Sequence, residues 1–381
     1  MKGIAVNLTT ELHELAMFEI PDLPVISAYL DTQWRDQHQH ERVATFLKTH
    51  LRQAASLVFD SETAQKSLDA DLERIAQRDV KLLRGESKYH TPGLALFACS
   101  GAGLWMEIAA PVPFENEFTI ADRPALRQLA RLDDDYGTTL VVLVDSRAAR
   151  ICEVVSGGLL AETDMRGNVP GRHKQGGCSQ MRYQRHIKDR MDHHHKDVAD
   201  YLAACLVAQP KTALILCGQA EIVANFRRFL APVVQQQIID ELQLDIRTPQ
   251  AEIVEVAKAV IERHEREAEQ EHVQQLINCA GRGGLAVLGL QETIAAANTG
   301  RIHLLVMDRN VKGQGWRCQV CDDIGEGQAQ SCSACGGHMA AVALGEALVN
   351  QVLKTDAEVD LIEPDARLAA YEGVGAFLRY K

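Results

Sequence analysis

The stretch that decides the fold of this 381-residue chain is "TTLVVLVDS", residues 138–146. Its continuous apolar run predicts a β-strand. Outward along the chain, "AARICEVVSGG" at 148–158 predicts a second strand, and "LLAETDM" at 159–165 is a candidate third strand. We therefore expect a β-sheet in the middle of the chain.

A glycine-bearing loop and a long helix follow these strands. The loop contains "RHKQGGCSQMRY", residues 172–183, and from Met181 apolar residues recur at three- and four-residue steps, which is typical of a helix. Arg182, Arg185 and Arg190 fall off that apolar stripe, so we expect them to face outward. A buried strand, "TALILC" at 212–217, and two short helices on either side of Pro232 complete an α/β domain over residues 138–247.

The rest of the chain divides around this domain. Residues 1–135 contain strand-like and helical stretches and end near "LDDDYG" (132–137), which we interpret as a linker. Thr248-Pro249 is typical of a helix start and opens a connecting helix over 248–280. Residues 281–381 predict an α/β layer domain, with helices at Leu290–Asn298 and Ala341–Leu353 around a cysteine-rich insert at 312–338. The expected fold class is α/β, as an α+β multidomain chain of three domains.

Charge is distributed unevenly along the sequence. The net charge of −12 argues against indiscriminate nucleic-acid binding. Residues 166–196, however, hold eight Lys or Arg against two acids, a local charge of +6, with five histidines besides. Apolar runs stay far below the roughly 20 residues that span a bilayer, and the N-terminus lacks the order of a signal peptide. We therefore expect a cytoplasmic protein with no membrane partner.

Four of the ten cysteines form the most specific motif. Ten residues separate Cys318-x-x-Cys321 from Cys332-x-x-Cys335, and four thiolates aimed at one point suit a structural, tetrahedral zinc ion. The alternatives are reduced thiol turns or a redox site, and His338 is near enough in sequence to replace one ligand. The other cysteines are scattered, which indicates a reducing compartment rather than a disulfide framework.

The glycine pair and a histidine run each have a functional interpretation and an alternative without that function. Glycines leave backbone N–H groups accessible, so Gly176 and Gly177, flanked by Lys174 and Arg182, are candidates to cradle phosphate. The alternative is a surface loop without that role. Consecutive helical residues point about 100° apart, so His193–His195 are not expected to share a metal; we expect them on a solvated or RNA-facing helix surface.

The segment "GRHKQGGCSQMRYQRHIKDRMDHHHKDVADYL" (171–202) resembles the archaeo-eukaryotic class I peptide-chain release factors, the family that includes Pelota. In that family a Gly-Gly-Gln loop precedes a long basic helix. "LAVLGLQETIAAANTGRIHLLVMDRN" (285–310) and "YEGVGAFLRY" (371–380) resemble its C-terminal domain, and the cysteine insert is similar to that of archaeal members. The positions that fit the loop-and-helix pattern are Gly176, Gly177, Ser179, Arg182, Tyr183 and Arg185.

The resemblance is to a bacterial branch of that family, with ribosome-rescue factors and the hibernation factor Balon among the relatives. It implies three domains, a central domain of RNase H-like topology and binding in the ribosomal A site. A GTPase of the elongation-factor Tu class is an implied delivery partner, and one copy per A site favours a monomer.

Two departures from the family pattern bear on activity. In the family, the glutamine after the glycines orients water and stabilises the oxyanion at the peptidyl-tRNA ester; here that position is Cys178, and the nearest following glutamine is Gln180. The N-terminal part also lacks the Asn-Ile-Lys-Ser and Tyr-x-Cys-x-x-x-Phe elements that read stop codons. We therefore do not expect a codon-specific terminator.

Three functions stay open at this point. The first is a factor that occupies stalled or idle ribosomes without chemistry, and the second is a peptidyl-tRNA hydrolase with Gly176, Gly177 and Gln180 as its catalytic loop. The third is an RNA-binding adaptor acting off the ribosome. Whether the protein is an enzyme is thus undecided. The basic residues expected to contact ribosomal RNA and tRNA are Arg172, Lys174, Arg182, Arg185, Lys188 and Arg190.

Overall fold

The computed structural model describes residues 8–20, 22–33, 37–83, 91–135, 138–155, 158–167, 179–209, 212–328 and 330–381. The chain forms two compact units, each with its own sheets and helices. The larger unit is discontinuous, since it combines Met1–Asp134 with Ala268–Lys381, and the smaller unit is Asp135–Glu267. The expected α/β class is confirmed in its coarse form, as a mixed multi-sheet protein; the division into three domains stays a prediction.

A five-stranded sheet in the order β7-β6-β5-β8-β9 forms the middle of the smaller unit. The central strand β5 pairs antiparallel with β6 and parallel with β8. All six of its residues are buried, because neighbours flank it on both edges and helices cover both faces. The strands are β5 (Thr139–Val144), β6 (Ala148–Val155), β7 (Gly158–Arg166), β8 (Ala213–Cys217) and β9 (Ile238–Leu242).

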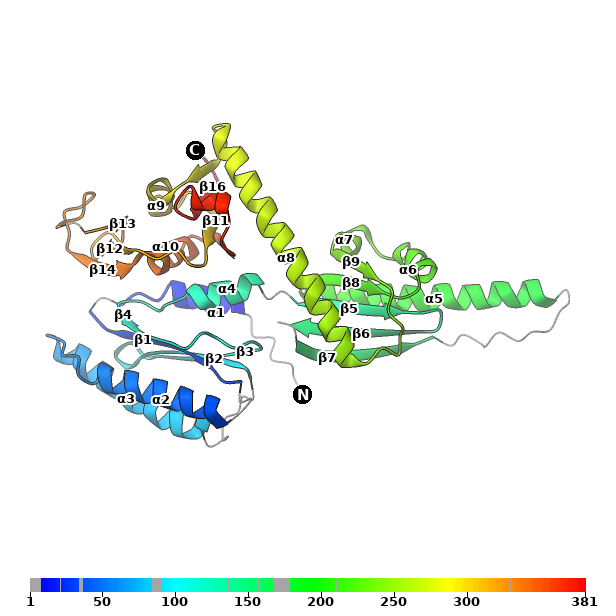
Figure 1. The fold of residues 1–381 in the computed structure, drawn as a ribbon, viewed down its shortest axis with the longest axis horizontal. Coiled ribbons are helices and arrows are strands. Elements are labelled where there is room, and N and C mark those ends of the chain that lie inside the picture. The colour runs from blue at the N-terminus through cyan, green and yellow to red at the C-terminus, as the bar shows by residue number, and fades with distance from the viewer. Residues whose placement is uncertain are drawn as a thin grey trace. The chain divides into compact units, whose positions relative to one another are not determined.

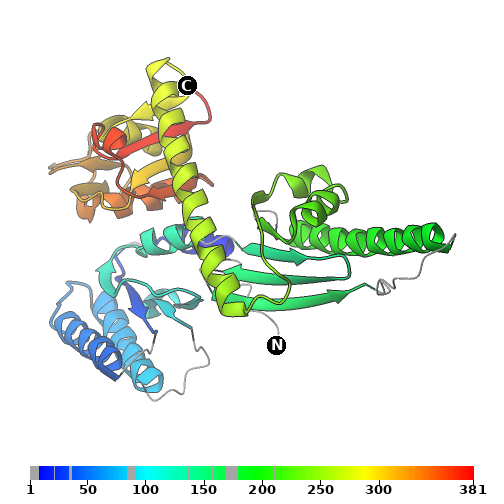
Figure 2. The same ribbon diagram turned by 45° about the vertical axis from the view of Figure 1, so that its right-hand side comes forward.

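Helices cover the two faces of this sheet (Figure 1). One face packs against α5, α6 and α7, through residues such as Val198, Leu202 and Phe226. The other face packs against the first turns of α8, through Ile253 and Ala257. Figure 2 shows the N-terminal half of α5 extending past the end of the sheet. The helices are α5 (Ser179–Ala208), α6 (Ala220–Arg227), α7 (Pro232–Gln235) and α8 (Gln250–Gly281).

The N-terminal part of the larger unit is an antiparallel sheet in the order β3-β2-β1-β4, with α2 and α3 on one face. Alternating residues of β1, among them Ile26 and Ala28, pack against Leu68 and Leu72 of α3. The elements are α1 (Leu8–Ala16), β1 (Val25–Asp31), α2 (Gln37–Ala54), α3 (Glu62–Leu83), β2 (Gly93–Cys99), a 3-10 turn at Ser100–Ala102, β3 (Leu104–Ala110), β4 (Glu117–Ala121) and α4 (Arg127–Asp135).

The C-terminal part of the larger unit holds a four-stranded sheet, β10-β16-β11-β15, and a three-stranded sheet, β13-β12-β14. The smaller sheet carries the cysteine-rich insert. The elements are β10 (Ala286–Leu288), α9 (Leu290–Asn298), β11 (Ile302–Asp308), β12 (Gln314–Cys318), β13 (Ile324–Glu326), β14 (Met339–Ala343), α10 (Leu344–Leu353), β15 (Glu358–Ile362), α11 (Ala366–Ala369) and β16 (Val374–Leu378).

Two predictions of local structure differ from the structure. The acidic stretch from Leu132 to Asp135, expected as a linker, is helical: it forms the end of α4, whose Leu129 and Leu132 side chains are buried, and the boundary between the two units falls within it. The helix expected to begin at Ala341 begins at Leu344, because the preceding residues pair with β12 as β14. Within the described ranges, no helix is both long and apolar enough to cross a bilayer.

Candidate functional site

The four cysteines predicted to bind metal lie together. Cys318 ends β12, Cys321 lies in the following turn, and Cys332 and Cys335 lie between β13 and β14. One sulfur ligand from each lies within 4.8 Å of the others. The Cys318–Cys335 and Cys321–Cys332 sulfur pairs are 3.4 and 3.5 Å apart. A tetrahedral zinc ion with bonds of about 2.3 Å would separate its sulfurs by about 3.8 Å, so the cluster has the right size and donor set for zinc.

Backbone N–H groups support this cluster. Val320 and Cys321 donate to the Cys318 sulfur, at 3.4 and 3.5 Å. These bonds, the Cys321 N–H first, lower the pKa of the Cys318 thiol and so favour the thiolate that a metal requires. Gly336 adopts a left-handed φ of 72°, and a Cβ at Gly337 would lie 2.7 Å from Val320. These glycines therefore let the second turn close against the first.

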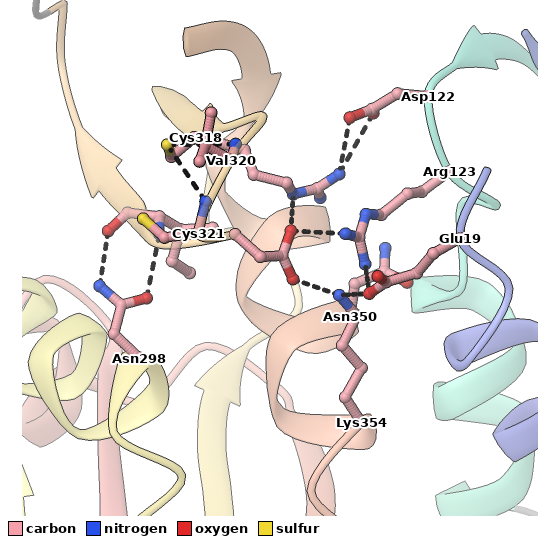
Figure 3. Close-up of polar contacts among 12 residues, drawn as sticks. Glu19, Asp122, Arg123, Asn298, Cys318, Val320, Cys321, Asn350 and Lys354 are labelled. Carbon is pink, nitrogen blue, oxygen red and sulfur yellow. Dashed lines mark hydrogen bonds and ion pairs between the residues drawn. The ribbon is translucent and has the colours of Figure 1, made fainter. Parts of the chain in front are cut away.

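The insert is attached to α9 by one side chain. Asn298 donates from Nδ2 to the Ile324 carbonyl at 2.9 Å and accepts from the Ile324 N–H at 3.0 Å (Figure 3). Because both bonds satisfy backbone groups of β13, Asn298 fixes the strand that follows the first cysteine pair. With four sulfur donors and no fifth protein ligand implied, the arrangement suits a closed structural site rather than a catalytic one.

The predicted loop and RNA-contacting residues are only partly described. Arg172, Lys174, Gly176 and Gly177 lie outside the described residues. Gln180 and Arg182 lie in the first turn of α5, but their side chains are outside the described part of the chain. The remaining three predicted RNA contacts are Arg185 and Lys188, both exposed, and Arg190, which is half-buried. Their contact with RNA stays a prediction.

The triple histidine does not lie on a solvated surface as expected. His193 is exposed, but His194 and His195 are 3% and 0% exposed. His195 contacts the Asp145 carbonyl from Nε2 at 3.3 Å and Asn225 from Nδ1 at 3.4 Å, and its ring stacks edge-on against Phe226. The prediction failed because the apolar stripe of α5 turns these two residues toward the sheet. Burial lowers the pKa of His195.

One half-buried carboxylate was not anticipated from the sequence. Glu346, in the first turn of α10, accepts the N–H groups of Leu126 at 3.0 Å and Arg127 at 3.2 Å. These are two of the donors that the start of α4 leaves without a helical partner. Burial, and then the charge of Glu117, raise the pKa of Glu346 to about 7. Nothing in the sequence indicates this contact, because 220 residues separate Glu346 from Leu126.

Comparison with known proteins finds sequences that are similar to this chain. The model of bacterial archaeo-eukaryotic release factor family 10 matches residues 124–279. Peptide chain release factor subunit 1 of Thermococcus onnurineus is 24% identical over 368 residues, covering 84% of this chain and 86% of that protein. The same factor of Methanocaldococcus jannaschii is 24% identical over 388 residues, covering 89% of each.

One of the solved structures that the chain matches is also from this group of proteins. It is a model of ribosome-bound archaeal Pelota and ABCE1, which matches 100% of this chain and 96% of its own, with 14% identity and a TM-score of 0.43. The sequence relatives span both the central segment and the segments on either side of it. The resemblance to release factors predicted from the loop and helix is therefore confirmed.

Proposed function

Because the chain is related to the bacterial archaeo-eukaryotic release factors of family 10 through residues 124–279, we propose that it is a ribosome-binding translation factor. It occupies the A site of stalled or idle ribosomes and protects them, without reading a stop codon. The observation that carries this proposal is Cys178, which stands where the family has its catalytic glutamine. Without that side chain beside the ester, the loop acts as an anchor rather than as a hydrolase.

The basic side of α5 supports the binding half of the proposal. Arg185 and Lys188 are exposed in the first half of α5, the part of the helix that follows the loop in the sequence. Cations presented there bind RNA phosphates, while the acidic remainder of the chain limits attachment to other RNA. The sheet order β7-β6-β5-β8-β9 is compatible with the RNase H-like topology that the family resemblance implies. Zinc in the four-cysteine cluster, the cytoplasm as location and a monomeric state belong to the same proposal.

The second candidate is a peptidyl-tRNA hydrolase that rescues stalled ribosomes. Gly176 and Gly177 are retained, and Gln180 is the glutamine nearest after them. In this version Gln180 orients the water. Delivery by a GTPase of the elongation-factor Tu class is compatible with either candidate.

Hydrolysis of labelled peptidyl-tRNA on purified stalled ribosomes separates the two. Wild type, Gln180→Ala, Gly177→Ala and Cys178→Gln are compared, and binding is followed in the same samples by sedimentation. The occupancy proposal expects all four proteins to sediment with ribosomes. It also expects no release by the first three, whereas Cys178→Gln, which restores Gly-Gly-Gln, gains release. Release by wild type that Gln180→Ala abolishes without loss of binding would establish the hydrolase instead.

A further inference from the structure

A short segment of the N-terminal part is fastened to the C-terminal part of the same unit. We call residues 122–127, from the end of β4 to the first residue of α4, the docking segment. Asn350 of α10 donates to the Pro124 carbonyl at 3.1 Å, and Arg127 donates to the Val311 carbonyl at 3.2 Å. Glu346 accepts two backbone N–H groups of the same segment. The segment is thus bound along its length to residues that follow it by about 185 to 225 positions.

The charged end of this contact converges on Asp322. Figure 3 shows its outer members, with Arg123, Glu19 and Lys354 close together. One carboxylate oxygen of Asp322 accepts from Arg123 of the docking segment at 2.5 Å and lies 3.8 Å from the Arg317 guanidinium. The other oxygen bonds the Lys354 ammonium. Arg123 and Lys354 also share Glu19, and Arg317 reaches Asp122 at 3.1 Å. A single carboxylate therefore touches three cations drawn from both parts of the unit.

The position of Asp322 is set by the cysteine turn. It follows Cys321 directly and has a left-handed φ of 67°, a conformation that aspartate tolerates better than most residues. Its N–H donates to the Cys318 carbonyl at 3.1 Å, and the Cys318 sulfur accepts two N–H groups of the same turn. A metal held by Cys318 and Cys321 would lock this turn and with it the direction of the Asp322 side chain.

Loss of the Asp322 charge would leave the cations around it poorly compensated. Among the described residues, the network holds three cations, with side chains only 6% to 12% exposed, and three carboxylates. Of the carboxylates, Asp322 is 27% exposed, whereas Asp122 and Glu19 are 41% and 47% exposed. Removing its charge leaves three largely desolvated cations facing two outer carboxylates, and a buried charge left without its partner is strongly unfavourable.

We propose that the four-cysteine turn is a metal-dependent clasp: metal in the cluster holds Asp322 in place, and Asp322 holds the docking segment against the C-terminal part. The cluster would then do more than stabilise its own small sheet. It would also determine whether the docking segment stays bound to the C-terminal part. This inference does not depend on ribosome binding.

Hydrogen–deuterium exchange on the full-length, zinc-loaded protein tests the clasp. Asp322→Asn removes the charge at the centre of the network, and Asp323→Asn is the matched control, since within the described residues the Asp323 carboxylate makes no ion pair. Zinc content is measured for each variant. Peptides from β5 and β8, in the other unit, serve as the internal reference.

Removing zinc from wild type with a chelator is expected to speed exchange in residues 122–134 about tenfold, together with residues 312–343. Asp322→Asn with zinc retained is expected to speed exchange in 122–134 alone, and Asp323→Asn to change neither. If Asp322→Asn loses zinc, Lys354→Met breaks the same network at a residue outside the cysteine turns and takes its place. The clasp is overturned if chelation speeds amide exchange only in residues 312–343. It is also overturned if the variant of the network that retains zinc exchanges like wild type in residues 122–134.

Discussion

The ionisation of Glu346 couples the stability of the protein to pH. Its pKa of about 7 lies above the ordinary value of 4.5, so the folded protein binds a proton that the unfolded chain releases. Its contribution to stability is present at low pH and is lost as the pH rises through 7. As the pH rises from 5 to 8, the free energy of unfolding of Glu346→Gln should increase by about 2 kcal/mol relative to that of wild type. Urea unfolding at both pH values measures this difference.

Glu292 provides the matched control for this prediction. It occupies the same place in the first turn of α9 that Glu346 has in α10, but it is exposed. Glu292→Gln should track wild type at both pH values. A constant difference between Glu346→Gln and wild type across the range would show that the carboxylate stays ionised in the folded state.

His195 gives the opposite pH dependence in the smaller unit. Its pKa is lowered by burial, so the folded protein favours the neutral ring. Since the unfolded chain takes up a proton below about pH 6.5, the stability of this unit should fall as the pH drops below that value. His195→Gln should weaken this dependence and His193→Gln, at the exposed neighbour, should keep it. Protection of β5 and β8 from hydrogen exchange, compared at pH 5 and 7.5, measures this dependence. If both variants lose the same protection at pH 5, His195 is not the residue responsible.

At the scale of one element, the exposed face of α5 is expected to carry the RNA contacts. Replacing Arg185 and Lys188 together by Glu should weaken ribosome binding and lower the slope of log affinity against log salt by about 2, one for each lost phosphate contact. The matched control reverses Lys258 and Arg266, two exposed cations of α8. Equal weakening by both double variants would indicate general charge attraction in place of a contact made by α5.

Elements differ in how far the sequence predicts them. The strands β5 and β8 and the helix α8 were predictable because each has a continuous or periodic apolar pattern. The strands β12, β13 and β14 were missed, since they are short and stabilised by the cysteine turns and by Asn298 rather than by a pattern. His194 and His195 were misplaced for a related reason: polar residues carry no apolar signal even where the fold buries them.

At the scale of the whole molecule, the cysteine cluster should account for a separate part of the stability. We expect one zinc ion per chain in protein purified without chelator, and loss of that ion in Cys332→Ser. Because structural zinc sites contribute folding free energy directly, the larger unit should melt at a lower temperature in this variant, while the smaller unit is unchanged. Calorimetry with metal analysis checks this.

Cys279→Ser is the control for the metal experiment, since Cys279 is a partly exposed cysteine outside the cluster. It should keep its zinc and its melting profile. Of the candidate site, the spacing in the sequence predicted that the four cysteines would lie together, which they do. The sequence did not predict the network around Asp322, because that network joins residues far apart in the sequence, such as Arg123 and Asp322, which are 199 positions apart, and Glu19 and Lys354, which are farther apart still.

The discontinuity of the larger unit has a consequence during synthesis. A ribosome that adds roughly 5–20 residues per second needs roughly 7–27 s to pass the 133 residues of Asp135–Glu267. For that interval the newly made docking segment has no Glu346, Asn350 or Asp322 to receive it. The N-terminal sheet must therefore hold its shape on its own core while the chain is still being translated, and the last ion pairs close only after the cysteine turns have emerged.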